Sequence, residues 1–321
     1  METKKTLRFR PDGTFKIVQF TDVHWQESDE ADAKTKQVME QVLDVEKPDF
    51  VMFTGDVIFS CMDSDGNATC SDPLRSLREA VASVVERHIP WSLVFGNHDS
   101  EFNITRQALM EEAMRLPYSL CEAGPTDIAG VGNYVMPVWS KNKDKDEEAA
   151  LLYGIDSGEY SDHPLVGGYA WIKQNQIQWY IEQSQAWQAK CNGATLPALA
   201  FFHIPLPEYQ MMWQRATCYG QKQEDICAPY VQSGLFTAML EQGDVMATFC
   251  GHDHINDFYG KYYGIGLYYG RATGHNTYGR DGMLRGARVI SLTEGERQIQ
   301  SWLRLGDGSL ITEQPQHLPE Q

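Results

Sequence analysis

The sequence predicts a single α/β domain with mixed β-sheets. Segments with the patterns of strands and helices alternate through the first half of the 321 residues, and strand patterns dominate the second half. This order is expected of an α/β fold. The length allows one large domain or two ordinary ones. Because no repeat, linker or low-complexity tract interrupts the chain, we expect one domain over residues 1–321.

Apolar periodicity defines the elements of the first half. Residues 15–21 alternate between apolar and polar side chains, as in a half-buried strand, and two short apolar runs that stop near glycine fit buried strands. Helical spacing fills the intervals, and prolines mark some of the helix boundaries. The predicted strands are residues 15–21, 50–54 and 91–95, and the predicted helices are residues 31–46, 73–88 and 104–115.

The second half is richer in strand patterns. The charge run 141–148 separates two apolar segments and predicts a solvated hairpin loop. The last ~60 residues are rich in glycine, tyrosine and alternating apolar residues, which favours further strands. The predicted strands are residues 134–139, 150–155, 199–202 and 245–250, and the predicted helices are residues 171–189 and 234–242.

The charge balance restricts the partners. The chain carries 27 Lys+Arg against 44 Asp+Glu, a net charge of −17. Nucleic acids and anionic membranes are bound mainly through Lys and Arg, so neither is favoured. No stretch approaches the ~18–20 apolar residues of a membrane span. A small substrate fits this composition better than a large polyanion, and the oligomeric state stays open.

The compartment is left open by the sequence. The N-terminal residues 1–10 are charged without a following apolar segment, so they are no signal peptide. We expect either a cytoplasmic protein or an extracytoplasmic one, secreted or periplasmic, whose leader has been removed. Of the seven cysteines, Cys61 and Cys70, and likewise Cys218 and Cys227, bracket polar segments. These pairs fit disulfides in an oxidising compartment, and free thiols are the alternative.

Five apolar runs end at side chains that can bind metals. Ligands of open α/β sheets collect at the carboxyl ends of strands, so the five segments can converge on one site. Side chains alternate along a strand, so each Asp-x-His or His-x-His pair is expected to chelate one ion. The five segments are Asp22-Val-His24, Gly55-Asp56, Gly96-Asn97-His98-Asp99, Phe202-His203 and Gly251-His252-Asp253-His254.

The donor types indicate the metal. Imidazole, carboxylate and amide oxygen without paired cysteines suit Zn, Mn or Fe. Two ions close together need a bridging ligand, and Asp56, a lone carboxylate between glycine-flanked turns, suits that place. Each segment alone is common, but coincidence is a poor explanation for all five in this order.

The ordered set resembles the signature of the calcineurin-like metallophosphoesterase superfamily: D-x-H, G-D, G-N-H-D/E, a lone His and G-H-x-H. Residues 202–209, 227–234 and 251–257 are similar to the small, atypical group of purple-acid-phosphatase-like proteins. The resemblance implies a four-layer αββα sandwich with two mixed β-sheets. It also implies a dinuclear centre of two divalent or trivalent ions at the C-terminal ends of the strands.

The resemblance also implies a role for each motif residue. His98 corresponds to the active-site histidine that binds no metal. Phe59 stands where true purple acid phosphatases have a metal-binding tyrosine, and the histidine of D-x-H is present, so an iron(III) requirement is in doubt. The implied ligands are Asp22, His24 and His254 for one ion, Asn97, His203 and His252 for the other, and Asp56 as the bridge.

The implied activity is phosphoester hydrolysis. Two ions clamp the phosphoryl group and generate hydroxide near neutral pH, and that hydroxide attacks phosphorus in line. His98 stabilises developing charge and protonates the leaving oxygen. Asp99 is a candidate to orient His98, with an exposed turn residue as the alternative.

Several weaker candidates surround this site. His275 and Arg271, in a Gly-rich loop, are candidates to bind the substrate. Glu208 and Tyr209 follow His203 closely and are candidates to line the cleft.

Three functions remain open. A phosphomonoesterase acting on a small phosphoester is favoured. A phosphodiesterase acting on a cyclic nucleotide, a glycerophosphodiester or nucleic acid would use the same centre, and nucleic acid is the least favoured because of the net charge. A non-catalytic metal-binding scaffold is the third, although a scaffold would need neither His98 nor the complete ligand set.

Overall fold

The computed structural model describes residues 6–27, 30–63, 65–144 and 147–319. The helices are α1 (Glu30–Glu46), α2 (Pro73–Ala80), α3 (Ala82–Glu86), α4 (Arg106–Arg115), α5 (Gln174–Lys190), α6 (Glu208–Arg215) and α7 (Leu235–Gln242). The strands are β1 (Thr14–Phe20), β2 (Phe50–Thr54), β3 (Trp91–Val94), β4 (Tyr134–Trp139), β5 (Glu148–Gly154), β6 (Ala198–Phe201), β7 (Cys218–Tyr219), β8 (Val245–Cys250), β9 (Tyr259–Tyr262), β10 (Ile265–Tyr269), β11 (Gly286–Thr293), β12 (Ile299–Leu305), β13 (Leu310–Ile311) and β14 (Gln316–His317).

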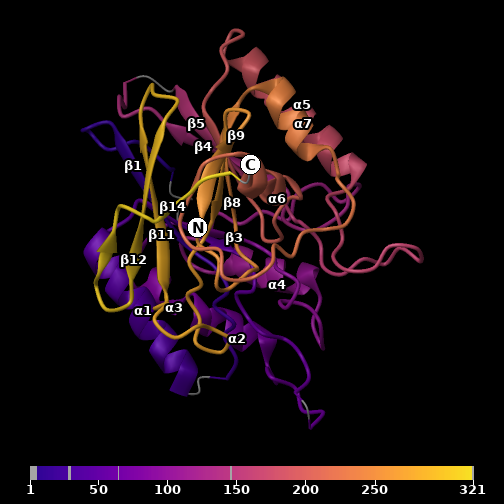
Figure 1. Ribbon diagram of the computed structural model, residues 1–321. Coiled ribbons are helices and arrows are strands. Elements are labelled where there is room, and N and C mark those ends of the chain that lie inside the picture. The colour runs from indigo at the N-terminus through magenta and orange to yellow at the C-terminus, as the bar shows by residue number, and fades with distance from the viewer. Residues whose placement is uncertain (1–5, 28–29, 64, 145–146, 320–321) are drawn as a thin grey trace.

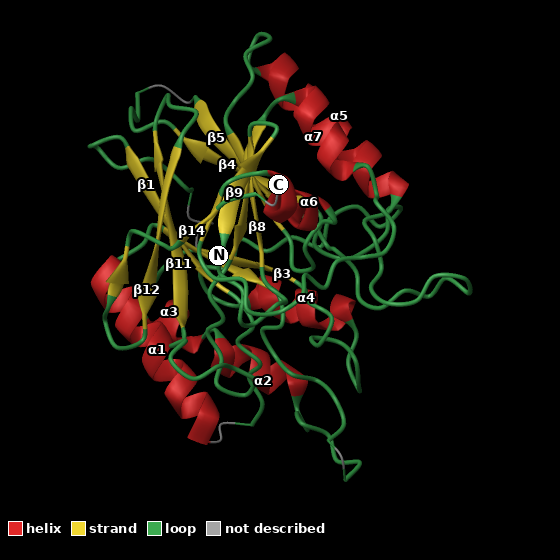
Figure 2. Cartoon of the chain, viewed as in Figure 1, coloured by secondary structure: helices red, strands yellow, loops and turns green. Residues whose placement is uncertain are grey.

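Two mixed sheets lie between two groups of helices (Figure 1). One sheet has the strand order β13-β12-β11-β1-β2-β3, and the other has the order β14-β7-β9-β10-β8-β6-β5-β4. Helices α1 to α4 cover the first sheet and α5 to α7 cover the second (Figure 2). The predicted four-layer αββα sandwich with two mixed sheets is therefore confirmed.

Three apolar cores separate these four layers. Strand β1 shows how the sequence builds them, because its side chains alternate between two cores. Phe15 and Ile17 lie in the core between the two sheets, whereas Val18 and Phe20 lie in the core under the first group of helices. A third core packs the second sheet against α5, α6 and α7. The rigid sandwich holds the ends of both sheets in place.

Two helical segments differ from the prediction. The predicted helix 73–88 is divided into α2 and α3 at Val81, which ends the first and begins the second. Helix α6 was not predicted because it has only eight residues and begins directly after Pro207, close behind the predicted site residue His203. The charge run 141–148 lies between the antiparallel strands β4 and β5, as predicted for a hairpin loop, although residues 145–146 lie outside the described residues.

The strands that carry the predicted metal ligands run parallel to their neighbours. Strands β1, β2 and β3 are parallel to one another in the first sheet, and β6 and β8 are parallel in the second. Their carboxyl ends therefore bring the five predicted segments to one end of the sandwich. No helix among the described residues is long and apolar enough to cross a membrane.

Candidate metal centre

The metal-competent side chains form two overlapping groups at this end of the sheets. The donor atoms within each group all lie within 4.8 Å of one another, and every residue in both groups is buried. Asp56 belongs to both groups, so its carboxylate is placed to contact two ions. The first group is Asp22, His24, Asp56 and His254, and the second is Asp56, His203 and His252.

Buried atoms without partners show that these side chains fit metal ions. Among the described residues, six buried side-chain nitrogen or oxygen atoms make no hydrogen bond, and five of them belong to predicted ligands. A buried polar atom without a partner is costly, and a metal ion supplies the missing partner. The five atoms are Nδ1 and Nε2 of His24, Oδ2 of Asp56, Oδ1 of Asn97 and Nε2 of His252.

Asn97 is the remaining predicted ligand, and it offers an amide oxygen. Its side chain is fully buried, and its Nδ2 donates to the hydroxyl of Tyr160 at 3.2 Å. This bond fixes the orientation of the amide and leaves Oδ1 without a partner. Amide oxygen is an appropriate donor for Zn, Mn or Fe in a mixed oxygen and nitrogen site.

Several candidate ligands have a left-handed backbone conformation, so the expected alternation of side chains along a strand does not apply to them. Asp22, His24, Asp56 and His252 have φ values of 52°, 50°, 50° and 80°, a region that non-glycine residues rarely occupy. The directions of these donor side chains are therefore set by tight turns beyond the strand ends and not by the alternation of side chains along a strand. The expectation that each short pair chelates one ion is wrong for His252 and His254, which belong to different groups.

Glycines of the motifs allow segments to approach closely. A Cβ atom on Gly96 would lie 2.1 Å from Oδ1 of Asp56, and one on Gly251 would lie 1.8 Å from Oγ1 of Thr21. Side-chain atoms cannot approach this closely, so only glycine fits at these two positions. The glycines of the signature are thus required by the contact between strand ends.

The two buried carboxylates are ionised. Burial opposes the charge of Asp22, but the hydrogen bond and charge of His254 lower its pKa to about 2. Burial likewise opposes the charge of Asp56, but the neighbouring His203 holds its pKa well below the usual range. Metal ligation requires deprotonated carboxylates, so both groups are in the form that binds cations.

The histidines divide into two kinds. Burial lowers the pKa of His24 to about 4, and burial with the charge of His203 lowers that of His252 to about 3. These two rings are neutral and can act as ligands. Burial opposes the charge of His203 as well, but Asp56 raises its pKa to about 9. The Nδ1 atom of His203 is hydrogen-bonded to the Thr54 carbonyl at 2.8 Å, so a metal would displace a proton from Nε2.

Glu101, which sequence reasoning missed, contacts His98. Its Oε2 lies 2.6 Å from Nδ1 of His98, and its Oε1 accepts a hydrogen bond from Tyr160 at 2.8 Å. Burial lowers the pKa of His98, but the hydrogen bond to Glu101 and the charge of Asp56 raise it on balance. The i,i+3 spacing to His98 is the only sequence signal for Glu101, and that spacing is too common to be decisive.

Asp99 has a different role from the one expected. Its carboxylate accepts hydrogen bonds from the backbone amides of Asp56 at 2.9 Å, Ile58 at 2.9 Å and Gly96 at 2.7 Å. Asp99 is also buried, so it is no exposed turn residue. It ties together the two turns that carry Asp56 and Asn97, whereas Glu101 contacts His98.

Three of the weaker candidates occupy structural positions. Arg271 is buried, forms an ion pair with Asp257 and donates to the Leu284 carbonyl at 2.7 Å, so its guanidinium is not free for a phosphate. Tyr209 is fully buried in the core under α6, and Glu208 beside it is also buried. Neither is an exposed residue of the cleft.

The loop that carries His275 does reach the centre. Gly274 donates to the carbonyl of Asp22 at 3.0 Å, and the hydroxyl of Thr277 contacts the ring of His254. The ring of Tyr278 lies 4.2 Å from that of His254. His275 itself is exposed, and its role in substrate binding stays a prediction.

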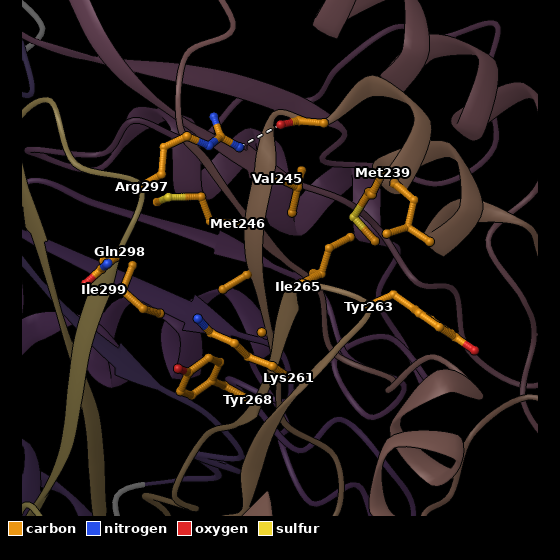
Figure 3. A pocket seen from close by; sticks show the side chains of 15 residues that line it. Met239, Val245, Met246, Lys261, Tyr263, Ile265, Tyr268, Arg297, Gln298 and Ile299 are labelled. Atoms are coloured by element: carbon orange, nitrogen blue, oxygen red, sulfur yellow. Dashed lines mark hydrogen bonds between the residues drawn. The ribbon is translucent and has the colours of Figure 1, made fainter. Parts of the chain in front are cut away.

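Two other features lie apart from this centre. A cavity of about 400 Å³ opens at the start of β8 and is lined in part by Lys261, Arg297 and Ile299 (Figure 3). None of the predicted site residues lines it. All seven cysteines are free thiols, which agrees with the alternative to disulfides, and Cys250 is buried.

Comparisons with known proteins agree with this geometry. The sequence matches the calcineurin-like phosphoesterase family over residues 15–256. It is 34% identical to "Probable inactive purple acid phosphatase 29" of Arabidopsis thaliana, across 96% of this chain and 86% of that protein. It is 37% identical to "Phosphatase DCR2" of Saccharomyces cerevisiae, across 93% of this chain and 55% of that protein.

A solved structure shares the fold. A dimetal phosphatase from Danio rerio superposes with a TM-score of 0.57 at 14% identity, covering 89% of this chain and 98% of that one. The motifs, the two-sheet sandwich and the buried cluster of Asp and His residues all agree with the family match. The chain therefore belongs to the calcineurin-like phosphoesterase family.

Proposed function

We propose that the protein is a phosphomonoesterase that uses two metal ions. The observation that carries the proposal is the clustering of buried Asp and His donors in two groups that share Asp56, in which four donor atoms make no hydrogen bond. The proposed ligands are Asp22, His24 and His254 for one ion, Asn97, His203 and His252 for the other, and Asp56 for both.

The chemistry divides between the metals and His98. When bound, two metal ions polarise the phosphoryl oxygens and lower the pKa of water near them. When the His98 ring is protonated, its Nδ1 donates to Glu101, and its Nε2 carries the proton that His98 gives to the oxygen of the leaving group. The side chain of His98 is one-quarter exposed, so a substrate can reach it.

Aromatic residues beside the centre fit a small organic phosphoester. The ring of Tyr169 lies 4.3 Å from that of His252 and stacks on Tyr160, while Tyr278 packs on His254. The net charge of −17 opposes a large polyanion but not a small phosphate ester at two cations. Mn, Zn and Fe are the candidate metals.

A scaffold without catalysis is the competing reading, because some relatives are named "probable inactive". The presence of His98 beside both donor groups favours the enzyme. Reconstitution with Mn, Zn or Fe, followed by assays on an aryl phosphomonoester and a bis-aryl phosphodiester, tests the proposal. Faster hydrolysis of the monoester supports the proposal, and faster hydrolysis of the diester assigns a diesterase. If neither ester is hydrolysed and fewer than two ions are bound, the protein is a scaffold.

His98→Asn provides the variant for that assay. We expect two bound ions and a loss of turnover of ~10²–10⁴-fold, the usual contribution of general acid catalysis. His88→Asn is the matched control, since His88 is exposed at the end of α3 and asparagine tolerates its positive φ of 56°. Unchanged turnover in His98→Asn would remove the proposed role of this histidine.

A further inference from the structure

A chain of hydrogen bonds connects His98 to a proposed metal ligand. Nδ1 of His98 lies 2.6 Å from Oε2 of Glu101, and Oε1 of Glu101 accepts from the hydroxyl of Tyr160 at 2.8 Å. The same hydroxyl accepts from Nδ2 of Asn97 at 3.2 Å. Each donor meets an acceptor along this chain, so the directions of the bonds are mutually consistent.

Packing restricts the remaining freedom of the His98 ring. Phe59 lies edge-on to it with ring centroids 5.0 Å apart, and the ring of His24 lies 5.3 Å away. Aromatic neighbours on these sides limit tilting, and the bond to Glu101 limits rotation about the Cβ–Cγ bond. The Glu101 carboxylate is itself held, because only 17% of its side chain is exposed and Tyr160 anchors its second oxygen.

We propose that Glu101, anchored by Tyr160, is the positioning residue that fixes the His98 imidazole with Nδ1 turned inward and Nε2 facing the substrate. This inference rests on the proposed function, since it specifies how His98 delivers its proton. Glu101 thus has the role of orienting His98, which the sequence suggested for Asp99. Tyr160 has two functions in this arrangement, because its hydroxyl is hydrogen-bonded to both the Glu101 carboxylate and the Asn97 amide.

In the step that Glu101 assists, the leaving oxygen takes its proton from His98. The oxygen of hydroxide forms a new bond to phosphorus, the bond between phosphorus and the leaving oxygen breaks, and the electron pair of that bond stays on the leaving oxygen. The proton on Nε2 of His98 moves to the same oxygen, which leaves as a neutral alcohol. Glu101 keeps its charge throughout and stabilises the protonated ring before transfer. The contribution of Glu101 to the rate should therefore be larger when the leaving oxygen is more basic.

The dependence on the leaving group provides the test. We expect Glu101→Ala in the metal-loaded protein to lower kcat about 100-fold for glycerol phosphate, a poor leaving group, and less than about 5-fold for 4-nitrophenyl phosphate. KM should change little, because Glu101 contacts His98 and not the substrate. Glu101→Gln should restore part of the loss, since an amide oxygen can still accept from Nδ1. Tyr160→Phe should show a smaller effect in the same direction.

A second readout is independent of turnover. In ¹⁵N-histidine NMR spectra of the metal-free protein, we expect a hydrogen-bonded Nδ1–H signal of His98 that is lost in Glu101→Ala. Glu112→Ala is the matched control, because Glu112 of α4 pairs with Arg78 of α2 at 2.7 Å and should alter neither readout. Thermal unfolding of each variant separates loss of folding from loss of positioning.

The outcomes separate the two proposals. An equal loss for both leaving groups, or an unchanged Nδ1–H signal in Glu101→Ala, would overturn the role of Glu101. Absence of hydrolysis in the wild-type protein would instead refute the proposed function, and the NMR comparison would still decide whether Glu101 fixes the ring.

Discussion

Replacement of Asp99 by asparagine tests whether this residue holds the site together or acts through His98. The carboxylate accepts two amides on Oδ2, from Asp56 and Gly96, and one on Oδ1, from Ile58. Asparagine keeps one acceptor oxygen. When that oxygen takes the place of Oδ2, the amide of Ile58 faces an NH₂ group and loses its partner.

The expected cost follows from that single lost bond. A buried amide without an acceptor costs ~1–3 kcal/mol, so Asp99→Asn should lower the free energy of unfolding by about that amount. Asp99→Ala removes all three acceptors and should cost more. Urea unfolding of the metal-free protein, followed by circular dichroism, measures both values. Asp127→Asn, at an exposed position, is the control and should stay within ~0.5 kcal/mol of the wild type.

A different result would assign Asp99 to catalysis. If Asp99→Asn leaves the free energy of unfolding unchanged and lowers turnover as far as His98→Asn does, Asp99 acts through His98. The three backbone contacts would then not be its main contribution.

Three further predictions concern the centre. Gly251→Ala should weaken metal binding ~10–100-fold, because the new Cβ would lie 1.8 Å from Oγ1 of Thr21 and 2.8 Å from Oδ2 of Asp22 and would displace the segment that carries Asp22. Titration with Zn²⁺ measures this, and Gly167→Ala, with no atom within 4 Å, should bind normally. In the metal-free protein, burial opposes the charge of His203, but Asp56 raises its pKa from 6.5 to about 9. The stabilisation of the fold by this pair is therefore complete below pH 6.5 and lost as pH rises through 9. The difference in unfolding free energy between wild type and His203→Gln should shrink over that range, and a constant difference would contradict the assignment. The iron-loaded wild-type protein should lack tyrosinate absorption in the visible range. The Phe59→Tyr variant should gain this absorption, since the ring of Phe59 lies 5.2 Å from the ring of His24. A coloured wild-type protein would be inconsistent with this prediction.

The strands and helices of the α/β domain were predictable because their signals are local, whereas the four-layer sandwich was implied by the family resemblance. The alternation in β1 and the continuous apolar runs of β2 and β8 identify strands without knowledge of their neighbours. The break at Val81 and the short helix α6 were missed for a physical reason. Neither a break between two helical turns nor an eight-residue helix after Pro207 leaves a strong periodic pattern.

The clustering of the candidate ligands was predictable from the sequence, but their supporting contacts were not. Ligand motifs are short and lie at strand ends, so sheet topology brings them together. The hydrogen bond between Glu101 and Tyr160 joins two residues that lie 59 positions apart in the sequence, so no local sequence pattern predicts it. Arg271 illustrates the opposite error, because a cation in a Gly-rich loop reads as a phosphate ligand until Asp257 is seen beside it.

Anomalous X-ray scattering from crystals of the Mn- or Zn-loaded protein would show whether two ions share Asp56. We expect two anomalous peaks, one contacted by Asp22, His24 and His254, the other by Asn97, His203 and His252, with Asp56 contacting both. A single peak, or peaks away from Asp56, would contradict the two-ion centre on which the proposed function depends.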